Sequence, residues 1–229
     1  MADEGKRERS ADLLPLPRPV SGRFDCGADE LYVVTLSALL SGSHNSAQQA
    51  RQIWLEEHPD AKVHIFNSCS ASAGEVLLAM KIRAFASQGL SFQQVIREVD
   101  RFSRDMQTLF VLESLDNLRK NGRLTGLQSV VTGALRIKLL MGATPEGEIC
   151  KKGQAISIKQ ALSKMVELMV KDAKHVGRTL VLSHCNCLER AFQLKEMVLK
   201  ACQFRDVVIV ETRGISTVYA NDGGIVAAY

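Results

Sequence analysis

The sequence lacks the features that would assign it to several common classes of protein. No apolar stretch approaches the roughly 18–20 residues needed to cross a bilayer, and the start of the chain has no apolar signal-peptide core. The six cysteines follow no disulfide-framework spacing. These absences predict a cytoplasmic location, reduced cysteines and no stable membrane insertion.

The sequence also lacks a large excess of charge of either sign. Its 29 basic and 25 acidic side chains are well mixed along the chain and leave a net charge of +4. No long basic run is present, so we expect no nucleic-acid partner. The glycine-rich motifs that bind nucleotide phosphates are absent as well. We therefore predict that the protein carries no cofactor.

The 229 residues, 46% of them hydrophobic, are enough for two small lobes. Residues 1–25 are charged and then proline-rich, which predicts a disordered or loosely attached tail. In residues 26–105 the apolar runs 31–36 and 63–67 are each followed by a helical pattern, which predicts the strands of a parallel sheet. Residues 106–229 predict a second, mixed α/β lobe.

Local signals place several element boundaries. Ser91 and Gln94 have the spacing of a capping box at the start of a helix. Short helices are predicted over 113–120 and 126–135. The Pro-Glu-Gly sequence at 145–147 predicts a hairpin turn between two strands.

A small, hydroxyl-rich loop follows each of the two predicted parallel strands. The first loop and the start of the following helix hold Ser37, Ser41, Ser43 and Ser46 around Gly42, and the second loop spans 68–74. Loops at the carboxyl ends of parallel strands form the ligand crevice of such sheets, and the N-terminus of the next helix favours an anion. A carboxylate or phosphate is therefore the expected ligand. The alternative is that these serines only cap the helix, as serine commonly does.

Other patterns suggest chemistry less strongly. Ser72 resembles the nucleophile of a hydrolase, but the nucleophile elbow needs glycine where this chain has Ser70, and no histidine has triad spacing. Residues 184–187 (His-Cys-Asn-Cys) lack a second ligand pair for zinc, and Asn186 is predicted to cap a helix. We predict no metal site. Arg123 follows a glycine turn and is a candidate clamp for an anion.

Four segments, taken together, resemble the signatures of the DegV family. Their order and separation agree with the family pattern from about Leu31 to the end of the chain. They are the strand-loop-helix segment Thr35–Ala47, the serine-rich segment Asn67–Gly74, the Gly-Arg segment Leu115–Leu124, and the segment Gly133–Lys138.

The resemblance implies a two-lobed α/β architecture that holds one long-chain fatty acid between the lobes. The carboxylate is expected at the serine loops and the acyl chain in an apolar tunnel. The family presents the fatty acid to a separate fatty-acid kinase for bacterial phospholipid synthesis, so a carrier rather than an enzyme is implied. The lipid-binding residues implied are Ser37, Ala38, Ser41, Gly42, Ser43, Ser72, Arg123 and Asn221.

The sequence also departs from the family pattern. The family begins with a further strand and a Thr-Ser-Gln-Pro segment that do not occur here, and Ala38 stands where the family has a head-group serine. We therefore expect an incomplete first lobe with an exposed sheet edge. Two alternatives follow, namely a diverged or truncated member that acts as an interaction or regulatory protein without ligand, and a serine hydrolase at Ser72.

Overall fold

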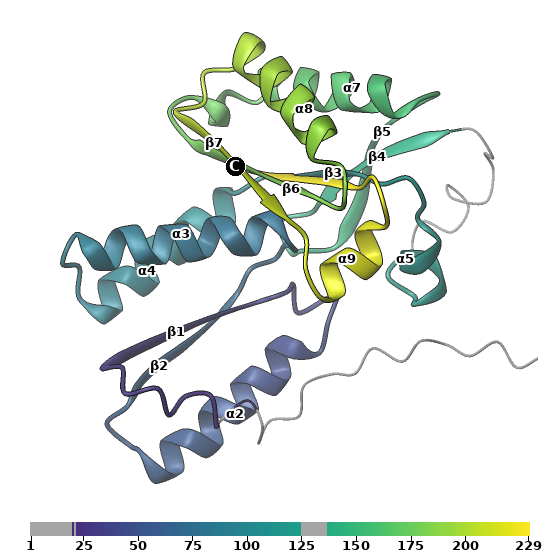
Figure 1. The fold of residues 1–229 in the computed structure, drawn as a ribbon. Coiled ribbons are helices and arrows are strands. Elements are labelled where there is room, and N and C mark those ends of the chain that lie inside the picture. Colours follow the sequence, from purple (N-terminus) through teal and green to yellow (C-terminus); the bar gives the residue numbers. More distant parts are fainter. Residues whose placement is uncertain (1–19, 21, 125–136) are drawn as a thin grey trace, which may run out of the picture.

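The computed structural model describes residue 20 and residues 22–124 and 137–229 (Figure 1). Three predictions fall mostly or wholly outside these residues, namely the tail, the helix over 126–135 and the segment 133–138. Phe24, which belongs to the predicted tail, is buried and meets the Trp54 ring edge-on at a centroid distance of 6.2 Å.

The first part of the described chain is a two-stranded parallel sheet with helices on both faces. The strands pair from Glu30 opposite Lys62 to Thr35 opposite Asn67, which confirms the predicted parallel unit. Val63 and Ile65 pack against α2, whereas Phe66 packs against α3 and α4. The elements are β1 Glu30–Thr35, α2 Ser43–Glu57, β2 Lys62–Asn67, α3 Ala73–Ser87 and α4 Phe92–Asp105.

A six-stranded sheet of order β5-β4-β3-β8-β6-β7 forms the second part. Only β6 and β7 are parallel, and the other neighbours are antiparallel, so the predicted mixed character is confirmed. The elements are β3 Thr108–Val111, α5 Asp116–Lys120, β4 Lys138–Ala143, β5 Ile149–Ala155, α7 Ile158–Lys171, η2 Ala173–His175, β6 Thr179–His184, α8 Leu188–Ala201, β7 Asp206–Glu211, α9 Ile215–Ala220 and β8 Ile225–Ala228.

Both faces of the six-stranded sheet are covered, because alternate side chains of its strands point to opposite sides. Leu109, Leu180 and Leu182 face α7 and α8, which lie over one face (Figure 1). Phe110 and Val181 face the other side, where α3, α5 and α9 supply the cover. Helix α3 also contacts β1 of the small sheet. The predicted division of the chain at 105/106 stays a prediction, since one helix packs on both sheets.

Several predicted boundaries are confirmed. The Ser91 N–H donates to Gln94 Oε1 at 2.8 Å, as a capping box requires. The turn at 145–147 joins β4 to β5, and Gly147 has a φ of +92° that a side chain would strain. Among the described residues, β1 pairs with β2 alone.

Other local predictions were wrong. Helix α5 begins at Asp116 rather than at Glu113, because Glu113 instead pairs with Lys138 and Arg190 on neighbouring elements. Asn186 does not cap α8, whose N-cap is Cys187. The Asn186 amide donates to Asp222 at 2.8 Å, so a tertiary contact replaces the predicted local one. The short elements η2 and α9 carried no sequence signal that we recognised.

Candidate functional site: a cavity between the serine loops and the six-stranded sheet

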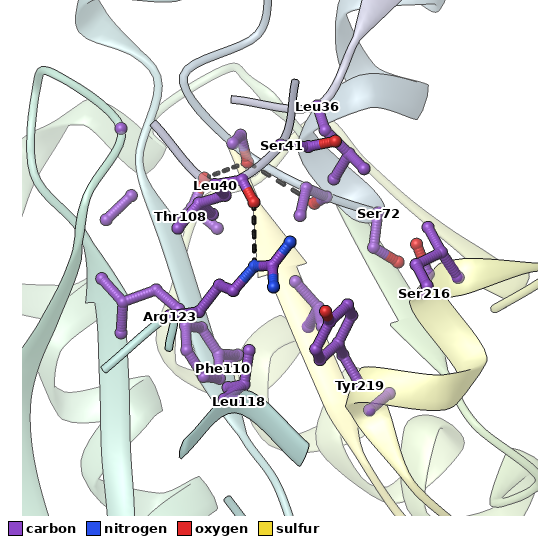
Figure 2. Close-up of a pocket in the computed structure, with 18 of the residues that line it drawn as sticks. Leu36, Leu40, Ser41, Ser72, Thr108, Phe110, Leu118, Arg123, Ser216 and Tyr219 are labelled. Atoms are coloured by element: carbon purple, nitrogen blue, oxygen red, sulfur yellow. Dashed lines mark hydrogen bonds between the residues drawn. The ribbon is translucent and has the colours of Figure 1, made fainter. Parts of the chain in front are cut away.

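A cavity of about 230 Å³ lies where the loops after β1 and β2 meet the six-stranded sheet (Figure 2). Its wall combines residues from both sides of the predicted division of the chain. From the serine loops and α2 come Leu36, Leu40, Ser41, Ser43, Ser70, Ala71 and Ser72. The rest of the wall is Thr108, Phe110, Leu112, Leu118, Arg123, Gly142, Ala143, Gly147, Glu148, Ile149, Ile215, Ser216, Tyr219, Ala220 and Val226.

The two serine loops lie together because β1 and β2 are parallel neighbours that end at the same edge. The Ser37 N–H donates to Ser70 O at 2.8 Å, which ties one loop to the other. Asn67 joins the loops a second time, since its Oδ1 accepts from the N–H groups of Ala38 and Cys69, each at 3.1 Å. The loops are therefore positioned by hydrogen bonds to backbone groups and to the Asn67 side chain before any ligand enters.

Two helix N-termini face the cavity. Ser43 is the first residue of α2 and Ser72 is the N-cap of α3, and each helix is 15 residues long. The first N–H groups of a helix lack intrahelical partners and carry the positive end of its dipole, so both termini favour an anion. The N-cap of α2 is Gly42, without a side-chain cap. Ser41 Oγ accepts from the Ser43 N–H at 3.2 Å and so satisfies one terminal amide of α2.

The Ser43 hydroxyl is buried and has no hydrogen-bond partner within the described part of the chain. The neighbouring hydroxyls are bonded, with Ser70 Oγ 2.7 Å from Thr108 Oγ1 and Ser72 Oγ donating to Ser183 Oγ at 2.7 Å. A buried polar group without a partner costs about 1–3 kcal/mol. Native proteins rarely keep such a group, and in a cavity wall it indicates a place where a polar ligand atom belongs.

Arg123 supplies positive charge to the cavity. Its Nε donates to Leu40 O at 3.1 Å and its Nη1 to Asn121 O at 2.6 Å. The guanidinium carbon lies 5.7 Å from the centroid of the Tyr219 ring, and Figure 2 shows the two side chains next to each other. Glu148, the acidic side chain of the wall, is exposed and lies in the β4–β5 hairpin.

The remainder of the wall is largely apolar. Phe110, Leu118 and Ile149 come from β3, α5 and β5. Leu36 directly follows β1, and Val226 lies within β8. In Figure 2 Phe110 and Leu118 lie beside the Arg123 stem. An apolar wall with hydroxyls, one arginine and two helix N-termini suits an amphipathic ligand that has an anionic head group.

The predicted site residues divide into two groups. Ser41, Ser43, Ser72 and Arg123 line the cavity, whereas Ser37, Ala38, Gly42 and Asn221 do not. The Ser37 hydroxyl donates to Gly147 O at 2.8 Å and so attaches the β4–β5 hairpin to the first loop. Ala38 is exposed. Asn221 accepts from Asn117 Nδ2 at 2.9 Å and donates to Ser114 O, which joins α9 to α5.

Sequence reasoning missed part of the polar wall. Thr108 opens β3 and reaches the cavity through its bond to Ser70, with no local signal that distinguishes it from other strand residues. Ser216 and Tyr219 lie on α9. The signal that could have identified these two residues is helical spacing. Tyr219 follows Ser216 by three residues and Ile215 by four, which places all three on one helical face.

The remaining chemical hypotheses meet a different geometry. The hydroxyl of Ser72 is bonded to Ser183, whereas a hydrolase serine is activated by a histidine. His184 accepts from the Cys187 N–H at 3.3 Å. Within the described ranges, no group of three His, Cys, Asp or Glu side chains is arranged to hold a metal. Helices long and apolar enough to cross a bilayer are also absent from these ranges.

A carboxyl group lies directly behind the cavity. Glu75 Oε2 accepts from the Ser72 N–H at 2.8 Å and so completes the N-terminus of α3. Burial raises the pKa of Glu75, and this hydrogen bond opposes the rise. Glu75 does not line the cavity, so its contact with Ser72 fixes the serine rather than the ligand.

Comparison with protein-family models identifies the family of this chain. The model of the family described as "Uncharacterised protein, DegV family" matches residues 22–229. The chain belongs to the DegV family. A "DegV domain-containing protein" of Streptococcus gordonii is 36% identical over 203 residues, which are 89% of this chain and 72% of that protein.

Two solved structures of DegV relatives share the fold. A DegV-family protein of Ruminococcus gnavus, refined with vaccenic acid, is 44% identical with a TM-score of 0.90, over 94% of this chain and 77% of that one. The Fatty Acid Kinase (Fak) B3 protein of Streptococcus pneumoniae, loaded with linoleic acid, is 35% identical with a TM-score of 0.87, over 94% and 76%. The predicted family and its α/β architecture are thereby confirmed.

Proposed function

We propose that this DegV-family chain binds one long-chain fatty acid in the cavity and presents its carboxylate to a fatty-acid kinase for phospholipid synthesis. The observation that carries the proposal is the buried Ser43 hydroxyl without a partner, in a wall that also holds Arg123 and two helix N-termini. A carboxylate would accept from these donors, and the apolar remainder of the wall would contact the acyl chain.

The bound ligands of the relatives support the same chemistry. The protein of Ruminococcus gnavus holds vaccenic acid and that of Streptococcus pneumoniae holds linoleic acid. Both ligands combine a carboxylate with a long apolar chain, which is the combination that the cavity wall suits. The second relative is named for a fatty-acid kinase, and this name supports the kinase as the partner.

The size of the cavity adds a consequence. Its 230 Å³ is below the roughly 300–1,000 Å³ of pockets that enclose a small molecule. A long acyl chain therefore has to extend beyond the cavity or move the apolar side chains of its wall. We accordingly expect binding to be accompanied by displacement of the wall, while the hydrogen-bonded serine loops stay in place.

The experiment is a titration of the delipidated protein with oleate, together with native mass spectrometry of the protein as purified from bacteria. Arg123→Met removes the guanidinium but keeps a stem that can cover Tyr219. We expect oleate affinity to fall at least tenfold, because a hydrogen bond to a charged group contributes about 1.5–3 kcal/mol. Arg119→Met is the matched control, since Arg119 is exposed on α5 and outside the cavity.

The kinase step has its own readout. Oleate-loaded protein, ATP and a bacterial fatty-acid kinase are mixed, and formation of acyl phosphate is measured with the wild-type chain and with Arg123→Met. At low protein concentration, we expect acyl phosphate to form with the oleate-loaded wild-type chain and not with Arg123→Met. No copurifying fatty acid together with no oleate binding would overturn the carrier function in favour of an interaction protein. Binding without acyl phosphate would overturn the kinase partnership alone.

A further inference from the structure

Ser72 has an uncommon backbone conformation, and hydrogen bonds of its backbone and of its side chain hold it in place. Its φ is +53°, which is uncommon for a residue other than glycine and costs about 1–3 kcal/mol unless its surroundings hold it. Two contacts hold it here. Its N–H donates to Glu75, and its hydroxyl donates to Ser183 Oγ at 2.7 Å. The hydroxyl thus faces the cavity from a position that cannot easily shift.

Ser183 belongs to β6, between β8 and β7 in the six-stranded sheet, and does not line the cavity. Only 1% of its surface is exposed. Its bond to Ser72 joins the sheet to the serine loop across 111 residues of chain. No other hydrogen bond of its hydroxyl occurs within the described part of the chain, so the Ser183 proton has no acceptor in this arrangement.

The direction of this bond matters for an anionic ligand. Each hydroxyl has a single proton, and the geometry of the contact assigns Ser72 as the donor to Ser183. Ser72 therefore offers only lone pairs to the cavity, and these repel a carboxylate. If Ser72 alone turned its proton to the ligand, two oxygens would face each other at 2.7 Å without a proton between them. The fully buried Ser183 oxygen would then have no partner, which is costly.

We propose that Ser183 is a positioning residue for the head-group site, which donates to Ser72 when a carboxylate binds. Both hydroxyls rotate about their Cβ–Oγ bonds, and each oxygen keeps its own proton. The bond between the two serines is retained with reversed direction, and Ser72 gains a bond to the ligand. Consecutive donors of this kind polarise one another, so Ser183 strengthens a contact that it does not make itself. This inference rests on the proposed fatty-acid function and extends it beyond the residues of the wall.

The test separates the head group from the acyl chain. Oleate and oleyl alcohol share one apolar chain, but only oleate is an anion that requires donors. Both are titrated into the wild-type chain, Ser183→Ala, Ser72→Ala and the double variant. We expect Ser183→Ala to weaken oleate binding roughly three- to tenfold, and oleyl alcohol binding less than twofold. In the Ser72→Ala background, Ser183→Ala should add no further loss for oleate.

A second variant keeps the test decisive if removal of a buried hydroxyl disturbs the sheet. Ser183→Cys preserves the shape of the side chain and a weak donor, so its loss of oleate affinity should lie between those of wild type and Ser183→Ala. Thermal unfolding shows that each variant is folded. Equal losses for oleate and oleyl alcohol would overturn the inference, because a structural role weakens both. An unchanged oleate affinity would also overturn it, whereas a wild-type chain that binds no oleate would overturn the proposed function itself.

Discussion

Replacement of Ser43 by alanine should move the stability of the ligand-free protein and its affinity for a fatty acid in opposite directions. The Ser43 hydroxyl is buried without a partner in the ligand-free protein. A buried polar group of this kind costs about 1–3 kcal/mol. Its removal should therefore raise the free energy of unfolding by about 1 kcal/mol or more, which corresponds to about 2–4 °C in Tm for a chain of this size.

The same substitution removes a donor from the proposed head-group site. A hydrogen bond to a charged group contributes about 1.5–3 kcal/mol, so oleate affinity should fall roughly tenfold or more. Urea unfolding of delipidated protein and calorimetric titration with oleate measure the two effects. Opposite signs are expected because the hydroxyl has no partner in the fold and is a donor in the proposed head-group site.

The matched control is Ser46→Ala on the same helix, outside the cavity. Alanine favours a helix over serine by about 0.5 kcal/mol, and this control measures that contribution. Ser43→Ala should stabilise the protein more than Ser46→Ala does, and only Ser43→Ala should weaken oleate binding. A Ser43→Ala variant that is less stable than Ser46→Ala would refute the reasoning, because the hydroxyl would then have a partner in the ligand-free protein.

Two further substitutions test the frame of the cavity. Gly147→Ala should lower the free energy of unfolding, measured in urea, by about 2 kcal/mol or more. The reasons are that φ is +92° and that a Cβ at this position would lie 2.4 Å from Ser37 Oγ. Gly153→Ala is the control and should change the free energy of unfolding little, because the nearest atom to its Cβ would be 3.8 Å away. Burial raises the pKa of Glu75 above its ordinary 4.5, so its contribution to stability is present below pH 4.5 and is lost as pH rises through the raised value. Glu75→Gln, which can still accept from Ser72, should flatten this decline and stabilise the protein at pH 7.5. Unfolding curves with the same pH dependence as wild type would contradict that expectation.

Local sequence determined much of the fold. The apolar runs that became β1 and β2, the capping box at Ser91 and the hairpin turn at 145–147 each depend on residues within one or two turns of chain. Such features form from propensities and hydrogen bonds between near neighbours, so a single sequence contains the information. The family signatures are of the same kind, because they are short segments in a fixed order.

The tertiary structure decided which of these residues line the cavity. Ser37 begins the first loop and Ser43 follows it as the first residue of α2, but Ser37 bonds to Gly147, 110 residues away, while the Ser43 hydroxyl has no partner among the described residues. Ser72 likewise meets Ser183 only because the small sheet packs against the large one. The sequence by itself determined that hydroxyls gather at the ends of two parallel strands. Contacts between distant segments decided which hydroxyls bond within the fold and which stay without a partner at the cavity, since a hydroxyl donates its single proton to whichever acceptor packing brings nearest.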